Sequence, residues 1–150
     1  RSSFRSSCWL FQFIWRRTAD TAYKIYSTEK VDLVLTDWAP DLDGIFLLDR
    51  IRKSEDSPNP FVPIVVVTAN TEIRHVCHAR DHGMTEYLAK PISATLIYQR
   101  ICTVIERHRD FIKNRDFFGP DRRRRDGKWT GADRRRSEPV EAPKTQSVWN

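Results

Sequence analysis

The chain has 150 residues, of which 39% are hydrophobic and 31% charged, and its formal net charge is +6. This length and apolar fraction support one domain with a single core and an extension. The longest apolar stretch, at 9–15, is too short to span a bilayer, and no small-residue cleavage site of a secretory signal follows it. The 3 cysteines have no short pairing pattern, which favours reduced thiols and a cytoplasmic location over a disulfide framework.

The first part of the chain predicts alternating helices and strands. A helix is expected at 2–11 and a short strand at 13–17, followed by a helix at 19–30 whose apolar residues share one face. Residues 31–36 are almost wholly apolar, as is typical of a strand that is buried on both faces.

The alternation continues through the middle of the chain. The expected elements, in chain order, are a helix at 43–53, a strand at 62–68, a helix from 70 to a left-handed cap at Gly83, a strand at 85–89 and a helix from 91 to about 112. This alternation predicts a parallel sheet with helices on both faces.

Three polar residues stand at the ends of predicted strands. Asp37 and Thr68 each end an apolar run, and Lys90 follows the last predicted strand. The carboxyl ends of parallel strands share one edge of a sheet, where ligand crevices form. A carboxylate, a hydroxyl and an ammonium can therefore meet there around one anion.

These residues lie in motifs that resemble the receiver domain of bacterial two-component response regulators, of the stand-alone, chemotaxis-regulator kind. The resemblance covers roughly residues 1–110 and rests on Leu-Thr-Asp-Trp at 35–38, Asp-Leu-Asp-Gly at 41–44, Thr68-Ala69, Tyr87 and Lys90-Pro91. It implies a flavodoxin-like, three-layer, doubly wound parallel sheet within residues 1–112, here missing its first strand.

The resemblance also implies roles for individual residues. Asp37 would accept a phosphoryl group, since a carboxylate can act as the nucleophile in phosphoryl transfer. Lys90 would contact a phosphoryl oxygen as a point charge, and Tyr87 would turn inward as Thr68 moves. The residues assigned to phosphate binding and switching are Thr68, Ala69, Tyr87 and Lys90, and Pro91 is expected to follow a cis peptide bond.

Receivers hold Mg²⁺ with an acidic pair at the end of their first strand. The resemblance assigns further Mg²⁺ ligands to the carboxylate of Asp37 and to the backbone carbonyl of Ala39. The acidic pair is absent from this chain, whose sequence opens inside what resembles the first helix of a receiver. We expect a fragment rather than a naturally shortened protein.

The expected partners follow from the same resemblance. A histidine kinase or a phosphotransfer protein would donate the phosphoryl group, and a downstream protein would bind the face made by residues 70–110. No enzymatic activity is expected beyond the chain's own phosphorylation and dephosphorylation, and neither a membrane nor nucleic acid is an expected partner of the receiver. The alternative is a pseudo-receiver, an interaction module that works without phosphorylation.

Residues 113–150 are interpreted as a basic, largely disordered tail. Residues 111–150 carry 11 Lys/Arg against 6 Asp/Glu, whereas 1–110 carry 15 against 14. Two Gly-x-Asp-Arg-Arg-Arg units recur at 119–124 and 131–136, and few aliphatic residues are available for a core. Arginine runs suit phosphates, so polyanion or nucleotide binding is a further alternative. The candidate residues are Arg122, Arg123, Arg124, Arg125, Arg134, Arg135 and Arg136.

Three histidines share one face of the helix that is predicted after residue 70. His75, His78 and His82, with Cys77 nearby, have a spacing that could bind Zn²⁺. We favour a solvated helix face over a metal site.

Overall fold

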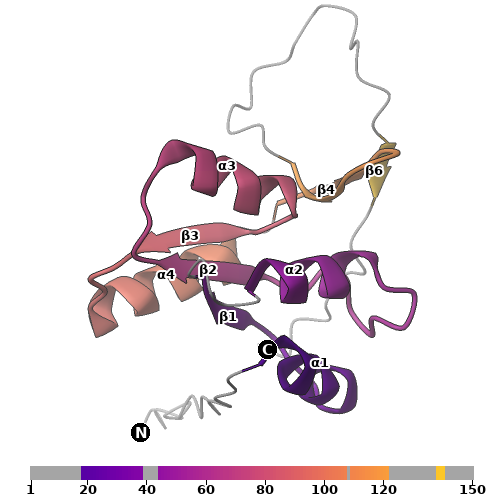
Figure 1. Cartoon of the computed structure of the whole chain (residues 1–150), viewed down its shortest axis with the longest axis horizontal. Helices are drawn as coiled ribbons and strands as arrows, with labels where there is room; N and C mark the ends of the chain where they lie inside the picture. The colour runs from indigo at the N-terminus through magenta and orange to yellow at the C-terminus, as the bar shows by residue number, and fades with distance from the viewer. Residues whose placement is uncertain (1–17, 39–43, 108, 122–137, 141–150) are drawn as a thin grey trace, which may run out of the picture.

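The structure is a computed structural model that describes residues 18–38, 44–107, 109–121 and 138–140. Its elements, in chain order, are α1 (Ala19–Thr28), β1 (Val34–Asp37), α2 (Gly44–Lys53), β2 (Ile64–Thr68), α3 (Ile73–Asp81), β3 (Glu86–Ala89), α4 (Ala94–Glu106), β4 (Phe111–Lys113), β5 (Phe118–Pro120) and β6 (Glu138–Val140) (Figure 1). The helix predicted at 2–11 and the strand predicted at 13–17 lie outside the described residues. None of the helices within the described ranges is long and apolar enough to cross a membrane.

A parallel sheet with the order β1-β2-β3 forms the centre of the fold. All five residues of β2 are buried, because β2 pairs with β1 and β3 along its two edges and helices cover both of its faces. β1 was expected to be buried on both faces, but Leu35 is 40% exposed. Among the described residues β1 is the edge strand, which explains this exposure.

The two faces of β2 pack against different helices. Ile64 and Val66 belong to a core cluster with residues of α1, α2 and α3. Val65 and Val67 point to the opposite face, because side chains alternate along a strand, and they pack with Val104 of α4. Figure 1 shows α4 across the sheet from α3. The predicted three-layer α/β architecture is therefore confirmed.

The last predicted helix is wrong at its C-terminal end. It was expected to run to about 112, but α4 ends at Glu106, and Phe111–Lys113 forms the strand β4. A tight turn follows, in which the side chain of Asn114 accepts hydrogen bonds from the backbone N–H groups of Asp116 and Phe117 at 3.0 and 2.7 Å. Asparagine favours such turns because its side chain can replace a backbone acceptor.

The interpretation of 113–150 as a disordered tail is also wrong for the part that the structure describes. β4 is the central strand of an antiparallel sheet with the order β5-β4-β6. Phe111 is 5% exposed, and its ring lies 5.1 Å from that of Phe61 and 5.5 Å from that of Phe118. Aromatic packing of this kind stabilises the contact beyond simple area burial, so the second sheet is part of the same folded unit.

A buried arginine joins the two sheets. Arg52 is 3% exposed and donates hydrogen bonds to three backbone carbonyls, those of Gly83 at 3.0 Å, Pro60 at 2.6 Å and Val62 at 2.8 Å. Its guanidinium also lies over the ring of Phe111, 5.3 Å from the ring centre. Burial lowers the pKa of Arg52 to about 9, so the side chain is still charged at neutral pH.

Gly83 has a structural reason to be glycine. Its φ of 88° lies in the left-handed region, as the predicted helix cap requires. A Cβ atom at this position would also lie 2.7 Å from the backbone oxygen of Phe118 in β5. The turn before β3 therefore packs directly against the second sheet.

We predict that Arg52→Met lowers the free energy of unfolding by about 2–4 kcal/mol, because three buried carbonyls lose their donor. Urea denaturation followed by circular dichroism measures this change. Lys53→Met is the matched control, since Lys53 lies next to Arg52 on α2 but its side chain is 49% exposed, and an exposed ion pair contributes at most about 1 kcal/mol. Equal effects of the two substitutions would contradict the role given to Arg52.

Candidate functional site at the carboxyl edge of the sheet

The register of the parallel sheet brings the three predicted strand ends together. Asp37 pairs with Val67, the residue before Thr68, and Thr68 pairs with Ala89, the residue before Lys90. Two further backbone bonds extend this pairing by one residue, from Trp38 N–H to the carbonyl of Val67 at 2.8 Å and from Lys90 N–H to that of Thr68 at 2.9 Å. The backbone at all three strand ends is therefore fixed by the sheet.

The acidic and basic side chains meet at this edge. The ammonium of Lys90 lies 2.5 Å from Oδ2 of Asp37. The side chain of Asp37 is 32% exposed and that of Lys90 is 39% exposed. The pair is therefore open to solvent, and a small anion can reach both groups.

Thr68 ends β2, the strand between β1 and β3, and the backbone of Asn70 connects its side chain to that of Tyr87. Thr68 is fully buried, and its hydroxyl oxygen accepts a hydrogen bond from the backbone N–H of Asn70 at 3.0 Å. The hydroxyl of Tyr87 donates to the backbone carbonyl of the same Asn70 at 3.1 Å. Burial raises the pKa of Tyr87 above its usual value. Asn70 is thus hydrogen-bonded to both side chains, through its N–H to Thr68 and through its carbonyl to Tyr87.

The other residues assigned to this edge are placed as follows. Ala69 is exposed directly after β2, and the peptide bond between Lys90 and Pro91 is cis, as the resemblance implied. Ala39 and the Asp-Leu-Asp part of the 41–44 motif lie outside the described residues, as do the arginines of 122–136. Nothing in the structure bears on the roles predicted for those residues.

The edge also needs a glycine at the start of α2. A Cβ atom on Gly44 would lie 2.7 Å from the backbone oxygen of Asp37 and 3.2 Å from the hydroxyl oxygen of Thr36. Only a residue without a side chain allows α2 to begin this close to the end of β1. Gly44 thereby fixes the backbone that carries Asp37.

The described residues do not by themselves fit a metal ion. No group of three or more His, Cys, Asp or Glu side chains in the described ranges is arranged to hold one. Mg²⁺ prefers several oxygen ligands, whereas Asp37 at this edge faces the ammonium of Lys90. Receiver domains generally bind Mg²⁺, but a magnesium site at Asp37 stays a prediction.

The histidines of α3 and Cys77 are likewise not arranged to hold a metal ion among the described residues. The preferred interpretation, a solvated helix face, is also wrong in part, because the rings of His75 and His78 contact the ring of Trp38 at 5.2 and 5.8 Å. The feature of the sequence that could have indicated these contacts is Trp38, a large aromatic residue directly after Asp37.

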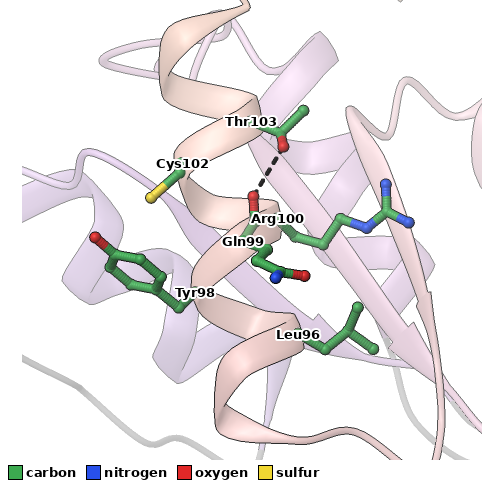
Figure 2. A pocket seen from close by; sticks show the side chains of 6 residues that line it. All are labelled: Leu96, Tyr98, Gln99, Arg100, Cys102 and Thr103. Atoms are coloured by element: carbon green, nitrogen blue, oxygen red, sulfur yellow. Dashed lines mark hydrogen bonds between the residues drawn. The ribbon is translucent and has the colours of Figure 1, made fainter.

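A shallow hollow lies away from this edge, along α4. It is lined by Leu96, Tyr98, Gln99, Arg100, Cys102 and Thr103. Figure 2 shows that these side chains point to different sides of the helix, and the dashed line is the hydrogen bond from the Thr103 hydroxyl to the carbonyl of Gln99. Because its lining comes from one helix, this hollow does not converge on a ligand as the strand ends do.

We predict that Gly44→Ala lowers the free energy of unfolding by about 1–3 kcal/mol, because the added methyl group displaces the end of β1. The sign is informative, since alanine in place of glycine within a helix ordinarily stabilises it by about 0.5–1 kcal/mol. Urea denaturation measures the difference. A variant as stable as the parent would show that α2 does not approach Asp37 this closely.

Comparison with known proteins is consistent with this geometry. Residues 11–102 match the model of the response regulator receiver domain. The chain is 35% identical over 94 residues to the transcriptional regulatory protein KdpE of Staphylococcus aureus, covering 60% of this chain and 38% of that protein. It is 30% identical over 88 residues to the chemotaxis protein CheY-3 of Vibrio cholerae, covering 58% of this chain and 66% of that protein.

Solved structures show the same fold. A response regulator from Thermotoga maritima aligns with a TM-score of 0.54 at 22% sequence identity, covering 63% of this chain and 76% of that one. A CheY-like receiver domain protein from Methanospirillum hungatei aligns with a TM-score of 0.51 at 22% identity, covering 59% and 69%. The chain spans less than two thirds of the length of the curated relatives named above. By its family match, the chain belongs to the response regulator receiver domain family.

Proposed function

We propose that this chain accepts a phosphoryl group on the carboxylate of Asp37 and passes the signal to another protein through residues 70–110. In the transfer, a carboxylate oxygen of Asp37 attacks the phosphorus of a phosphohistidine on a histidine kinase or a phosphotransfer protein. A bond from oxygen to phosphorus forms, the bond from phosphorus to the imidazole nitrogen breaks, and that nitrogen takes up a proton.

The observation that carries the proposal is the contact between Asp37 and Lys90 at a solvent-open strand edge. An ammonium beside the attacking carboxylate can contact a phosphoryl oxygen and offset the charge of the transferred group. An ion pair whose role is only to stabilise the fold does not need to be open to solvent or to lie beside other strand ends. Here the pair instead lies at the edge where parallel sheets bind ligands.

Thr68 and Tyr87 supply a route from the site to the proposed output face. The hydroxyl of Thr68 can donate its own hydrogen to a phosphoryl oxygen while its oxygen accepts from the backbone N–H of Asn70, so a movement of Thr68 toward the phosphoryl group would carry Asn70 with it. Asn70 is also bound by Tyr87, so the change at Thr68 alters the hydrogen bond that links β3 to the loop before α3. This supports a two-state shift of α3, β3 and α4 that is biased by phosphate contacts.

The test is the intact mass of the folded chain after incubation with acetyl phosphate and Mg²⁺. We expect the mass to rise by one phosphoryl group in the parent and to stay unchanged in Asp37→Asn. Asp32→Asn is the matched control, because Asp32 is an exposed aspartate shortly before β1 and its replacement should leave the adduct intact.

Circular dichroism on the same samples separates failure of folding from failure of chemistry. A folded parent without an adduct would overturn the proposal and favour the pseudo-receiver, which binds partners without phosphorylation. Binding of polyanions or nucleotides by the arginine-rich units stays a separate prediction, and the salt dependence of that binding is its test.

A further inference from the structure

The helix α3 has fewer fully buried residues than α2, which packs on the same face of the sheet. Ala79 is the one fully buried residue of α3, whereas α2, of similar length, buries Gly44, Leu47, Leu48, Ile51 and Arg52. Ile73, at the start of α3, is 76% exposed. Helices are mostly stabilised by packing of an apolar face. Ala79 and the half-buried Val76 and Cys77 supply part of this packing in α3, and ring contacts add to it.

Four rings make these contacts, and we call them the ring cluster: Trp38, His75, His78 and His82. Trp38 lies edge-on to His75 with the ring centres 5.2 Å apart, and it stacks on His78 at 5.8 Å and 22°. The ring of His78 lies 4.5 Å from that of His82. At the far end, Nδ1 of His82 lies 2.7 Å from a carboxylate oxygen of Asp49 in α2.

Trp38 connects this cluster to the site. It directly follows Asp37, and its backbone N–H is bonded to the carbonyl of Val67 at 2.8 Å. Trp38 packs against the core cluster formed by residues of α1, α2, α3 and β2. One side of Trp38 is therefore anchored to the sheet, while the other side holds two histidines of α3.

We propose that the ring cluster is a conformational device that holds α3 in place in the unmodified protein and links its position to the state of Asp37. The first part stands on the ring contacts alone, and the second part rests on the proposed function. The contacts are formed while Asp37 is unmodified and paired with Lys90. A chemical change at Asp37 that moves α3 must break or rebuild them, and by linkage the contacts bias that change in return.

Hydrogen exchange of the α3 amides tests both parts. Three chains are compared in the unmodified state: the parent, His75→Ala/His78→Ala and His75→Phe/His78→Phe. The alanine pair removes both rings, whereas the phenylalanine pair keeps ring contacts with Trp38. Intrinsic helix propensity works against the expected result, because alanine favours a helix more than histidine does.

We expect the alanine pair to raise the exchange rate of amides 73–81 at least about tenfold, with the phenylalanine pair within about twofold of the parent. Amides of β2 serve as an internal control and should not change. Equal exchange in the parent and the alanine pair would overturn the role of the rings. Faster exchange in β2 as well would also overturn it, because the effect would then be global unfolding.

The same measurement after acetyl phosphate treatment tests the link to Asp37, with the adduct verified by intact mass. Phosphorylation should raise α3 exchange in the parent and the phenylalanine pair but change the alanine pair by less than about twofold. Unchanged α3 exchange in a phosphorylated parent would overturn the link. If the parent takes up no phosphoryl group, the proposed function and this link both fail, while the unmodified comparison still decides whether the rings hold α3.

Discussion

The parallel pairing of β2 with β1 and β3 is the constraint on which the rest of the site depends. This pairing aligns Asp37 with Val67 and Thr68 with Ala89, so three residues that are far apart in sequence reach the same edge. A shift of one residue in either register would turn the affected side chains to the other face of the sheet. The site is thus a consequence of the apolar strand β2, whose two buried faces allow no such shift.

The two edges of the sheet differ in how far their side chains are buried. The carboxyl edge carries an ion pair that is open to solvent, and α3, the helix that follows Thr68 in the chain, buries a single residue completely. The amino edge is closed by Arg52 and by the aromatic contacts of the second sheet. Arg52 and Phe111 at the amino edge are buried, whereas the ion pair at the carboxyl edge is open to solvent. Local opening motions occur mainly in segments with few buried apolar contacts.

The sequence predicts much of this arrangement because apolar runs and polar strand ends leave a direct signal. β2 and β3 lie at the predicted places, Asp37, Thr68 and Lys90 lie at neighbouring strand ends, and the side chains of Asp37 and Lys90 are in contact. Less visible was the burial of Arg52, although it lies four residues after Leu48 on the apolar stripe of α2, where a charged residue is out of place. The hairpin that begins at Phe111 was missed because short strands of a few residues do not show a clear alternation, and because Phe111 and Phe118 pack against Phe61, which is distant in sequence.

The most direct test of the account is to locate the modification itself. The folded chain is treated with acetyl phosphate and Mg²⁺, reduced with borohydride, which converts an aspartyl phosphate to homoserine, and mapped by tandem mass spectrometry. We predict that Asp37 is converted and that Asp32 and the other carboxylates are not. Conversion at a different aspartate, or none in a chain shown to be folded, would contradict it.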